Sequence, residues 1–321
     1  MQKIISIIGP TATGKTSLAL KIADQVIGSE KYSGVDVISV DSRQVYKGLE
    51  IVSGADLPEH LDSNIKIHGV SIINPDQEWS LAHFRELALE IISNAKEKNN
   101  LVILVGGTGL YHSKLIPTNG ERIKTNALGI KPDLELRKKL DKLSVPELQA
   151  ELQKVDKKKL ESMNNSDRQN PRRLIRAIEI ANAQVFSAAG VYHVLRHGAG
   201  VTERISIGLS DGLENINNNI KKRVLERFEN GAVEEVRVLI KKFGMENNFP
   251  ALSATGVKEI SKYLDKKLSK EECIKAWTLR EYQYAKRQIT WWKKNKDIRW
   301  YEVSDENWEE KAQKKILDFV L

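Results

Sequence analysis

The amino-acid sequence predicts an α/β fold, in which a parallel β-sheet is covered by helices on both faces and a helical insertion interrupts the chain. Three observations support this prediction. Short apolar runs alternate with helically spaced segments over the first third of the chain, a glycine-rich loop joins the first run to the first helix, and only helical periodicity is found between about residues 117 and 184. Such alternation is typical of βαβ units, whose strands pair in parallel.

The first third of the chain supplies four predicted strands and two predicted helices. The strands are short and apolar, as expected for strands buried on both faces. They are Lys3–Ile8, Val35–Val40, a part of Ile65–Ile73, and Leu101–Val105. The helices are Thr16–Val26 and a segment that follows the N-cap Ser80 and continues to about Lys96.

The remainder is predicted to be mostly helical, with one further strand. Arg204–Leu209 (RISIGL) has the composition of a strand, so the chain re-enters the sheet there, whereas residues 185–202 receive no assignment. Helices are expected over Glu214–Gly231, Ala232–Phe243, Ser253–Leu264 and Ser269–Lys294. We therefore expect a core formed by residues 1–116 and 201–321, and a helical insertion formed by residues 117–200.

The composition excludes several classes of protein. The 321 residues include one cysteine, Cys273, which cannot form an internal disulfide or a zinc cluster. No run of about 18 uncharged apolar residues is present to span a membrane, and the N-terminus lacks the features of a signal peptide. These observations predict a reduced, cytoplasmic protein without a membrane segment.

The positive charge is unevenly distributed along the chain. Residues 1–116 contain 11 basic and 13 acidic residues, a net charge of −2, whereas residues 117–321 contain 40 and 30, a net charge of +10. A polyanion bound by the later part of the chain would explain this difference. On charge alone, a lysine-rich solvated surface is the better explanation.

A phosphate-binding loop is the clearest motif. The octapeptide between the first predicted strand and helix matches G-x-x-x-x-G-K-[ST], and its residues are Gly9, Pro10, Thr11, Ala12, Thr13, Gly14, Lys15 and Thr16. In such a P-loop, backbone N–H groups and the helix N-terminus surround a phosphate. Lys15 is predicted to contact the terminal phosphates and the Thr16 hydroxyl to bind Mg²⁺, with a purely structural turn as the alternative. The expected sheet is therefore P-loop NTPase-like.

The residues after the other strands differ from those of an ordinary nucleotide hydrolase. Such an enzyme places an acid at the end of an apolar strand to hold Mg²⁺, but Leu101–Val105 ends in Gly106-Gly107. Asp41 follows the second predicted strand instead, and a carboxylate at that position points into the ligand crevice of a parallel sheet. Asp41 is therefore a candidate general base, or else a residue that caps its own loop.

Basic residues are concentrated in three places. The C-terminal helix carries Lys286 and Arg287 beside Trp291 and Trp292, a combination that suits a nucleic-acid backbone and stacked bases. At helical spacing the tryptophans are equally well explained as core residues. Arginine pairs at i,i+4 spacing occur in two other predicted helices, and they are Arg172 with Arg176 and Arg223 with Arg227. The six histidines show no metal-ligand spacing.

Together these segments resemble the tRNA dimethylallyltransferases, also called tRNA isopentenyltransferases. The matching stretches, in the order of that family, are GPTATGKTSLA, ISVDSRQVYKGLEI, NPDQEWSLAHFR, LVGGTGLY, NPRRLIRAIEI, RFENGAVEEV and AKRQITWW. The resemblance implies transfer of a dimethylallyl group from dimethylallyl diphosphate to N6 of the adenine at position 37 of tRNA. Diphosphate is then a leaving group, so no acid that activates water is needed.

The resemblance also implies residue roles. Lys15, Mg²⁺ on Thr16, and Arg223 first or Arg227 second would neutralise the leaving diphosphate, while Asp41 accepts a proton from N6 and Thr11 helps to position these groups. The residues expected to face tRNA are Asp41, Ser42, Arg43, Gln44, Thr108, Arg172, Arg173, Leu174, Ile175, Arg176, Lys258, Lys286 and Arg287. The insertion would grip the anticodon stem-loop, and the enzyme is expected to be a monomer.

The sequence departs from the family pattern at Val257, where an aromatic residue is usual, and at Gln184–Gly190 and Thr118–Gly129. These differences concern the grip on tRNA. Three other functions remain open: an adenylate isopentenyltransferase, a P-loop small-molecule kinase, and an RNA-binding protein without enzymatic activity. The first two would use the phosphate loop without the basic C-terminal helix, and the third would leave Lys15 and Asp41 without a purpose.

Overall fold

The computed structural model describes residues 2–55, 57–58, 60–115, 130, 132–186, 203–246 and 249–321. The chain divides into two compact units, one formed by Met1–Glu121 and Ala199–Leu321 and the other by Arg122–Gly198. The domain boundaries expected from the sequence, and the departures at Thr118–Gly129 and in most of Gln184–Gly190, lie outside the described residues. Among the described residues, no helix is both long and apolar enough to cross a membrane.

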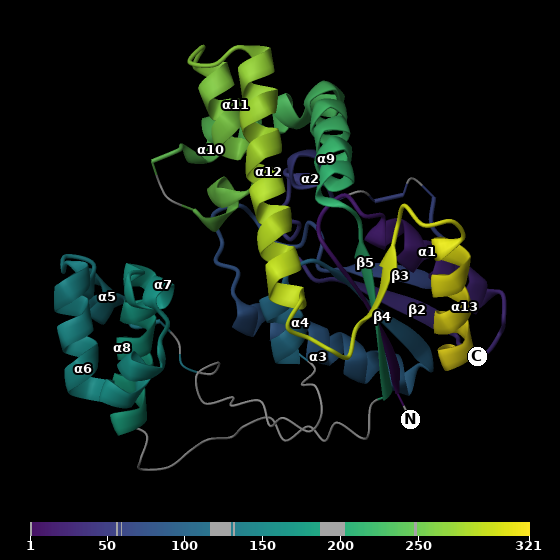
Figure 1. The fold of residues 1–321 in the computed structure, drawn as a ribbon, viewed down its shortest axis with the longest axis horizontal. Helices are drawn as coiled ribbons and strands as arrows, with labels where there is room; N and C mark the ends of the chain where they lie inside the picture. The colour runs from purple at the N-terminus through teal and green to yellow at the C-terminus, as the bar shows by residue number, and fades with distance from the viewer. Residues whose placement is uncertain are drawn as a thin grey trace. The chain divides into compact units, whose positions relative to one another are not determined.

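The larger unit contains a six-stranded sheet in the order β3-β2-β4-β1-β5-β6 (Figure 1), and every neighbouring pair is parallel. The strands are β1 (Lys3–Ile8), β2 (Gly34–Ser39), β3 (Ile65–His68), β4 (Asn100–Gly106), β5 (Glu203–Ser210) and β6 (Arg299–Glu302). The five predicted strands are confirmed. β6 was not predicted, because its RWYE sequence is exposed along most of its length and lacks an apolar pattern.

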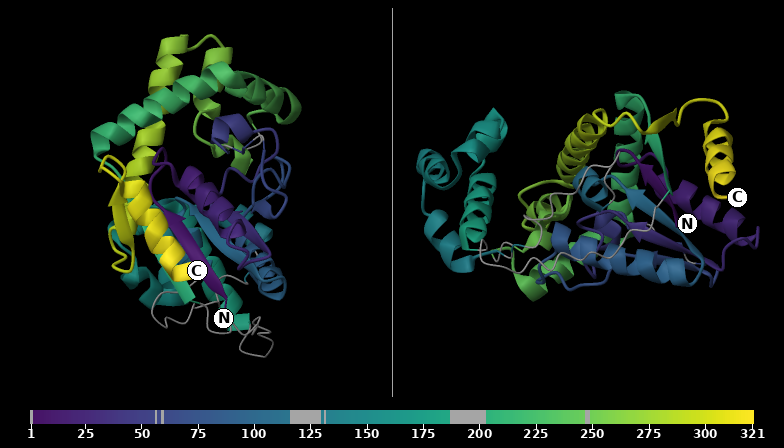
Figure 2. Two further views of the ribbon diagram at one scale, coloured as in Figure 1. Left: turned by 90° about the vertical axis from the view of Figure 1, so that its right-hand side faces the viewer. Right: turned by 90° about the horizontal axis from the view of Figure 1, so that it is seen from below.

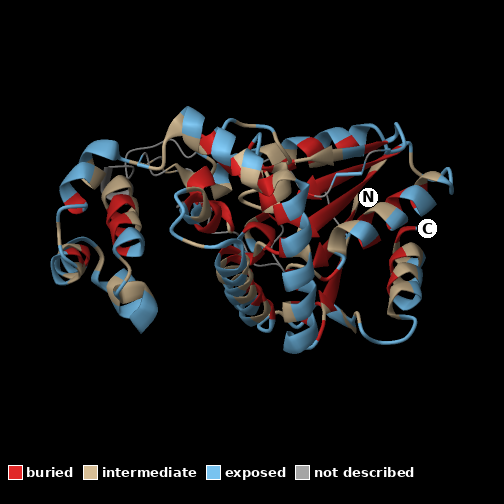
Figure 3. Ribbon diagram, turned by 90° about the horizontal axis from the view of Figure 1, so that it is seen from above, coloured by how far each residue is buried: buried red, intermediate tan, exposed pale blue. Residues whose placement is uncertain are grey.

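Helices cover both faces of this sheet, as predicted. Ile5 and Ile7 of β1 pack with α1 (Lys15–Ile27) and α13 (Trp308–Val320), whereas Ile4 points to the opposite face. That face is covered by α3 (Leu81–Glu97) and α4 (Gly109–Leu115). Figure 2 shows α1 and α13 side by side, and in Figure 3 the strands are buried while the helices are buried along one side only. As predicted, Ser80 caps α3 by accepting a hydrogen bond from the His83 N–H.

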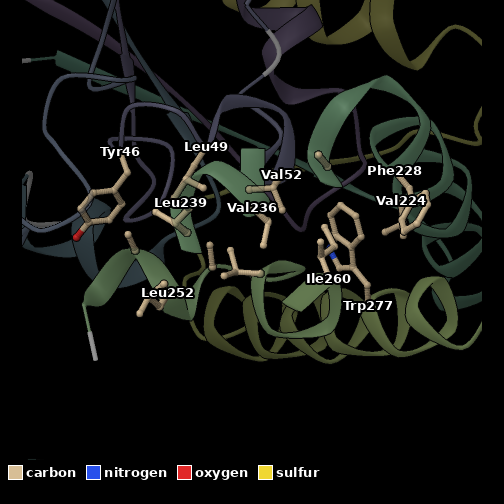
Figure 4. Close-up of a cluster of buried hydrophobic side chains, with 14 of the residues drawn as sticks. Tyr46, Leu49, Val52, Val224, Phe228, Val236, Leu239, Leu252, Ile260 and Trp277 are labelled. Carbon is tan, nitrogen blue, oxygen red and sulfur yellow. The ribbon is translucent and has the colours of Figure 1, made fainter. Parts of the chain in front are cut away.

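A second core in the same unit is formed by helices (Figure 4). These are α2 (Glu50–Ser53), α9 (Leu213–Arg227), the π-helical turn Phe228–Ala232, α10 (Val233–Phe243), the 3₁₀ turn Pro250–Ser253, α11 (Val257–Leu264) and α12 (Lys270–Trp292). Trp277 is fully buried in this core. Gly256 has a φ of 97°, and a Cβ there would lie 2.5 Å from the Trp277 ring, so only glycine fits.

The described residues of the smaller unit form helices with their own core. The helices are α5 (Leu134–Leu140), α6 (Val145–Ser162), α7 (Asn165–Arg168) and α8 (Pro171–Phe186). Leu148, Leu152 and Leu174 are completely buried in this core. The buried Glu179 carboxylate binds Arg137 at 2.7 Å and Arg176 at 3.2 Å, which links α5 to α8.

Candidate active site

The phosphate loop joins β1 to α1 with an unusual backbone. Gly9 and Gly14 have φ values of 143° and 78°, and Ala12 between them has a φ of 63°. A Cβ on Gly9 would lie 2.2 Å from the carbonyl oxygen of Leu209, so β5 leaves no space for a side chain. The glycine positions of the motif therefore follow from backbone conformation and close packing.

Lys15 lies in the first turn of α1 and folds back onto its own loop. Its Nζ donates a hydrogen bond to the Pro10 carbonyl oxygen. Burial, followed by the nearby positive charge of Arg223, lowers the pKa of Lys15 to about 7, although the Asp41 carboxylate opposes this change. An anion in the loop would restore the charge of Lys15, because it would supply the missing opposite charge.

Asp41 follows β2 and has one of its carboxylate oxygens engaged. Oδ1 accepts hydrogen bonds from the N–H groups of Arg43 at 2.7 Å and Gln44 at 3.3 Å. The loop-capping function considered from the sequence is therefore present. No described residue donates a hydrogen bond to Oδ2, and Asp41 lines the cavity described next, so capping leaves an oxygen for a ligand.

One cavity of about 910 Å³ brings most of the predicted site together. Its volume suits a ligand the size of a small organic diphosphate with part of an acceptor. The predicted site residues that line it are Thr11, Ala12, Thr13, Gly14, Lys15, Thr16, Asp41, Ser42, Arg43, Gln44, Arg223, Arg227 and Arg287. Gly106 and Gly107 line it where β4 ends, so that strand places backbone in the cavity and no acid.

The two arginines of α9 have different partners. Arg223 Nη1 lies 3.5 Å from Thr11 Oγ1 of the phosphate loop. Arg227 is buried, and its Nη1 binds Glu281 Oε1 of α12 at 2.7 Å. Both guanidinium groups pack directly against Gly54, because a Cβ there would lie within 3.1 Å of each of them. Arg223 is therefore the arginine directed at the loop, and Arg227 joins α9 to α12.

Comparison with known proteins identifies the family. The family model described as IPP transferase matches residues 44–295. The chain belongs to the IPP transferase family. A tRNA dimethylallyltransferase from Dictyoglomus turgidum is 35% identical over 93% of this chain and 86% of that protein. One from Moorella thermoacetica is 32% identical over 99% and 95%.

Two solved structures have a fold similar to that of this chain. A tRNA isopentenylpyrophosphate transferase from Bacillus halodurans has a TM-score of 0.66 at 28% identity and covers 100% of this chain and 96% of that chain. A eukaryotic dimethylallyltransferase described as acting on tRNA has a TM-score of 0.75 at 23% identity, covering 100% and 80%. The predicted family, its transferase class and the P-loop NTPase-like sheet are confirmed.

In this IPP transferase, the two tryptophans of AKRQITWW have different environments. Trp292 is 4% exposed and packs edge-on against His112 at 5.4 Å between ring centroids, so it is a core residue. Trp291 is 47% exposed and lies against Gly109, where a Cβ would be 2.0 Å from its ring. Burial lowers the pKa of His112 to about 3, in agreement with a structural histidine. The core interpretation is therefore confirmed for Trp292, whereas base stacking on the exposed Trp291 stays a prediction.

Lys286 and Arg287 of α12 are exposed and lie over the rings of Tyr282 and Tyr284, respectively. They also line a second cavity of about 910 Å³, together with Lys114, Arg204, Lys294 and Lys296. This concentration of basic side chains is consistent with a polyanion site on α12.

The remaining predicted residues lie elsewhere. Thr108 follows the glycine turn after β4, and its hydroxyl is buried beside Tyr284 of α12. Lys258 is exposed in α11 and lines neither cavity. In α8 of the smaller unit, Leu174 and Ile175 are buried in that unit's core. Only the three arginines of this run, Arg172, Arg173 and Arg176, therefore present side chains outside the core.

Several residues that line the cavity were not predicted, and two of them stand out by their contacts. Tyr284 and Gln288 both come from α12, and Gln288 accepts a hydrogen bond from the phosphate loop. Burial, then the nearby Asp41 carboxylate, raises the pKa of Tyr284 to about 12. The available signal was their position, with Gln288 inside the AKRQITWW stretch and Tyr284 directly before it, but helical spacing alone does not say which face of the helix turns inward.

Proposed function

We propose that this chain transfers the dimethylallyl group of dimethylallyl diphosphate to N6 of the adenine at position 37 of tRNA. The observation that carries the proposal is a single cavity lined by a P-loop lysine and by Asp41, with glycine rather than an acid at the end of β4. A site of this composition can stabilise a leaving diphosphate and accept a proton, while β4 ends without the acid that holds Mg²⁺ in enzymes that activate water.

The diphosphate end of the substrate would occupy the phosphate loop. Lys15 Nζ has three N–H donors, so it would keep its hydrogen bond to the Pro10 carbonyl and donate the others to the phosphate oxygens, while Arg223 would approach them from α9. Both cations would then stabilise the negative charge that develops as the C1–O bond breaks. In this assignment Arg227 acts indirectly, because its guanidinium is already bound to Glu281.

Magnesium fits this site only as an ion held largely by substrate. The described residues contain no group of three or more His, Cys, Asp or Glu side chains able to hold a metal ion. Thr16, however, lines the cavity in the first turn of α1. Mg²⁺ commonly binds one or two protein oxygens, substrate phosphates and waters. Bound in this way, it would supply further neutralisation of the diphosphate.

Asp41 would act as the general base. Its Oδ1 is fixed by two backbone N–H groups, which leaves Oδ2 to accept the proton. The N6 lone pair attacks C1, the C1–O bond breaks with its electron pair going to diphosphate, and the N6 proton passes to Oδ2. General-base catalysis of this kind typically contributes about 10²–10⁴-fold to a rate.

Exposed basic residues would contact tRNA, and the helical insertion would grip the anticodon stem-loop. Lys286 and Arg287 are exposed on α12, and Arg172 and Arg173 are exposed on α8. Phosphate contacts by such residues give affinity that falls as salt rises. A monomeric state and a cytoplasmic location stay predictions.

The deciding experiment is incorporation of radiolabelled dimethylallyl diphosphate into unmodified tRNA, with and without Mg²⁺, beside AMP and ATP as acceptors. We expect label in tRNA alone, in a reaction that needs Mg²⁺ and is lost in Lys15→Ala. Label in AMP or ATP would instead indicate an adenylate isopentenyltransferase. Consumption of ATP without label would indicate a kinase, and full cellular function of Lys15→Ala would indicate a non-enzymatic RNA-binding protein.

A further inference from the structure

Gln288 connects α12 to the phosphate loop. It is 5% exposed, and its Oε1 accepts a hydrogen bond from the Thr11 N–H at 3.0 Å. Because a backbone N–H can only donate, the amide oxygen of Gln288 is the atom that faces the loop. We infer that Gln288 is a positioning residue for diphosphate binding, which acts by fixing the Pro10–Thr11 peptide.

This peptide is held at both of its ends. Its carbonyl oxygen, on Pro10, accepts hydrogen bonds from the Thr13 hydroxyl at 2.9 Å and from Lys15 Nζ. Its N–H, on Thr11, is bound by Gln288. Since a peptide unit is planar, the contact with Gln288 sets the direction of the carbonyl that holds Lys15. The hydrogen bond from Thr11 to Gln288 therefore orients the Pro10 carbonyl and, through it, the Lys15 ammonium.

The amide nitrogen of Gln288 packs against the glycine turn that follows β4. A Cβ on Gly107 would lie 1.9 Å from Gln288 Nε2 and 3.0 Å from the Gly9 carbonyl oxygen. The turn and the amide are thus in direct contact, with no room for another side chain. One glutamine consequently fixes the ends of two neighbouring strands, β1 and β4, that open into the cavity.

Gln288 lies on the same helix as two of the residues proposed to face tRNA. Lys286 and Arg287, which precede it, are exposed and are the residues proposed above to face tRNA. The same helix would hold the RNA with one side and the diphosphate loop with the other. This last step rests on the proposed function, whereas the contact with the loop does not.

The test is the substitution Gln288→Met, which keeps the approximate shape of the side chain and removes its hydrogen-bonding atoms. We expect the Kd for inorganic pyrophosphate, measured with Mg²⁺ and without tRNA, to rise about tenfold, because the Pro10–Thr11 peptide that orients Lys15 loses its hydrogen bond to Gln288. The KM for dimethylallyl diphosphate should rise by a similar factor, while the Kd for tRNA stays within about twofold. Gln313→Met is the control, since it also removes a glutamine hydrogen bond, to Gln25 at 3.1 Å, but on α13.

A double-mutant cycle separates positioning from a general loss of structure. In a Lys15→Ala background, Gln288→Met should change the pyrophosphate Kd by less than about twofold, because the ammonium that it positions is gone. An equal effect with and without Lys15, or an unchanged pyrophosphate Kd in the single variant, would overturn the inference. The pyrophosphate measurements involve no transfer reaction, so they decide the role of Gln288 even if the proposed function fails.

Discussion

The phosphate loop and the wall formed by α9 and α12 differ in how the chain builds them. The loop consists of eight consecutive residues between a strand and a helix, and its conformation follows from its glycines. The wall depends on contacts between distant residues, such as Gln288 with Thr11, 277 positions apart. The comparison teaches that the backbone of the phosphate loop is set by neighbours in sequence, whereas its alignment with the wall is set by distant residues. Substitutions in the first region should therefore reduce turnover, and those in the second should reduce stability or alignment.

The largest effect is expected for Asp41→Asn. Asparagine keeps an oxygen for the N–H groups of Arg43 and Gln44 but cannot accept the proton from N6. We expect kcat to fall by about 10²–10⁴-fold, with the Kd for tRNA and the unfolding midpoint close to wild type. Single-turnover transfer assays would measure this, and near-normal turnover would remove Asp41 from the role of base.

The wall should respond most strongly to Glu281→Leu. The Glu281 carboxylate is 3% exposed and accepts hydrogen bonds from Arg227, from Trp277 Nε1 at 3.0 Å and from Thr255 at 3.2 Å. Its removal leaves Arg227 buried without its carboxylate, which typically costs about 3–5 kcal/mol. Urea titration should show this loss of unfolding free energy. The exposed Glu90→Gln is the control, expected within about 0.5 kcal/mol of wild type; equal effects of the two would contradict the wall's structural role.

The adjacent tryptophans offer a comparison within one motif. Trp292→Ala should lower the unfolding free energy by about 3–5 kcal/mol, as is usual for a buried aromatic residue. Trp291→Ala should change it much less, because that ring is half-exposed, and should instead weaken tRNA binding by about 1–3 kcal/mol if a base stacks on it. Denaturation and filter-binding assays would distinguish the two residues, and unchanged tRNA affinity of Trp291→Ala would exclude the stacking role.

The smallest effect concerns pH. The pKa of Lys15 is lowered to about 7 without a ligand, and bound diphosphate favours the charged lysine. Above pH 7 the neutral lysine must therefore take up a proton on binding, so this group weakens pyrophosphate binding by up to about tenfold per pH unit; below pH 7 its contribution is constant. Calorimetry on wild type and Lys15→Arg would isolate this slope, since arginine stays charged. Identical pH dependence in the two proteins would contradict the lowered pKa.

Most of the fold could be predicted because its signals are local. Strands such as Leu101–Val105 are buried on both faces and therefore continuously apolar, and the phosphate loop marks the first strand-to-helix junction. β6 could not be predicted, since RWYE forms a strand only by pairing with β5. The short helices α2 and α4 were missed for a similar reason, as each is too short to show a period.

The part of the candidate site that could be predicted is again the part whose signal is local in the sequence. The residues from Gly9 to Thr16, together with Asp41, could be recognised from spacing and position at strand ends. The resemblance ranked Arg223 before Arg227, but their helical spacing could not separate them, and their contacts with Thr11 and with Glu281 do. Gln288 was missed because a glutamine in a helix carries no signal until the loop that it contacts is placed beside it.

The strand order has a consequence for how the protein is made on the ribosome. β1 pairs with β4 and with β5, and β5 begins at Glu203, long after β1 ends at Ile8. At about 5–20 residues per second, the first strand waits roughly 10–40 s for its second neighbour, and α12 follows later still. The nascent chain thus carries a complete phosphate-loop sequence well before it can hold that loop in shape, and an incomplete chain that ends before α12 lacks the helix that closes the site.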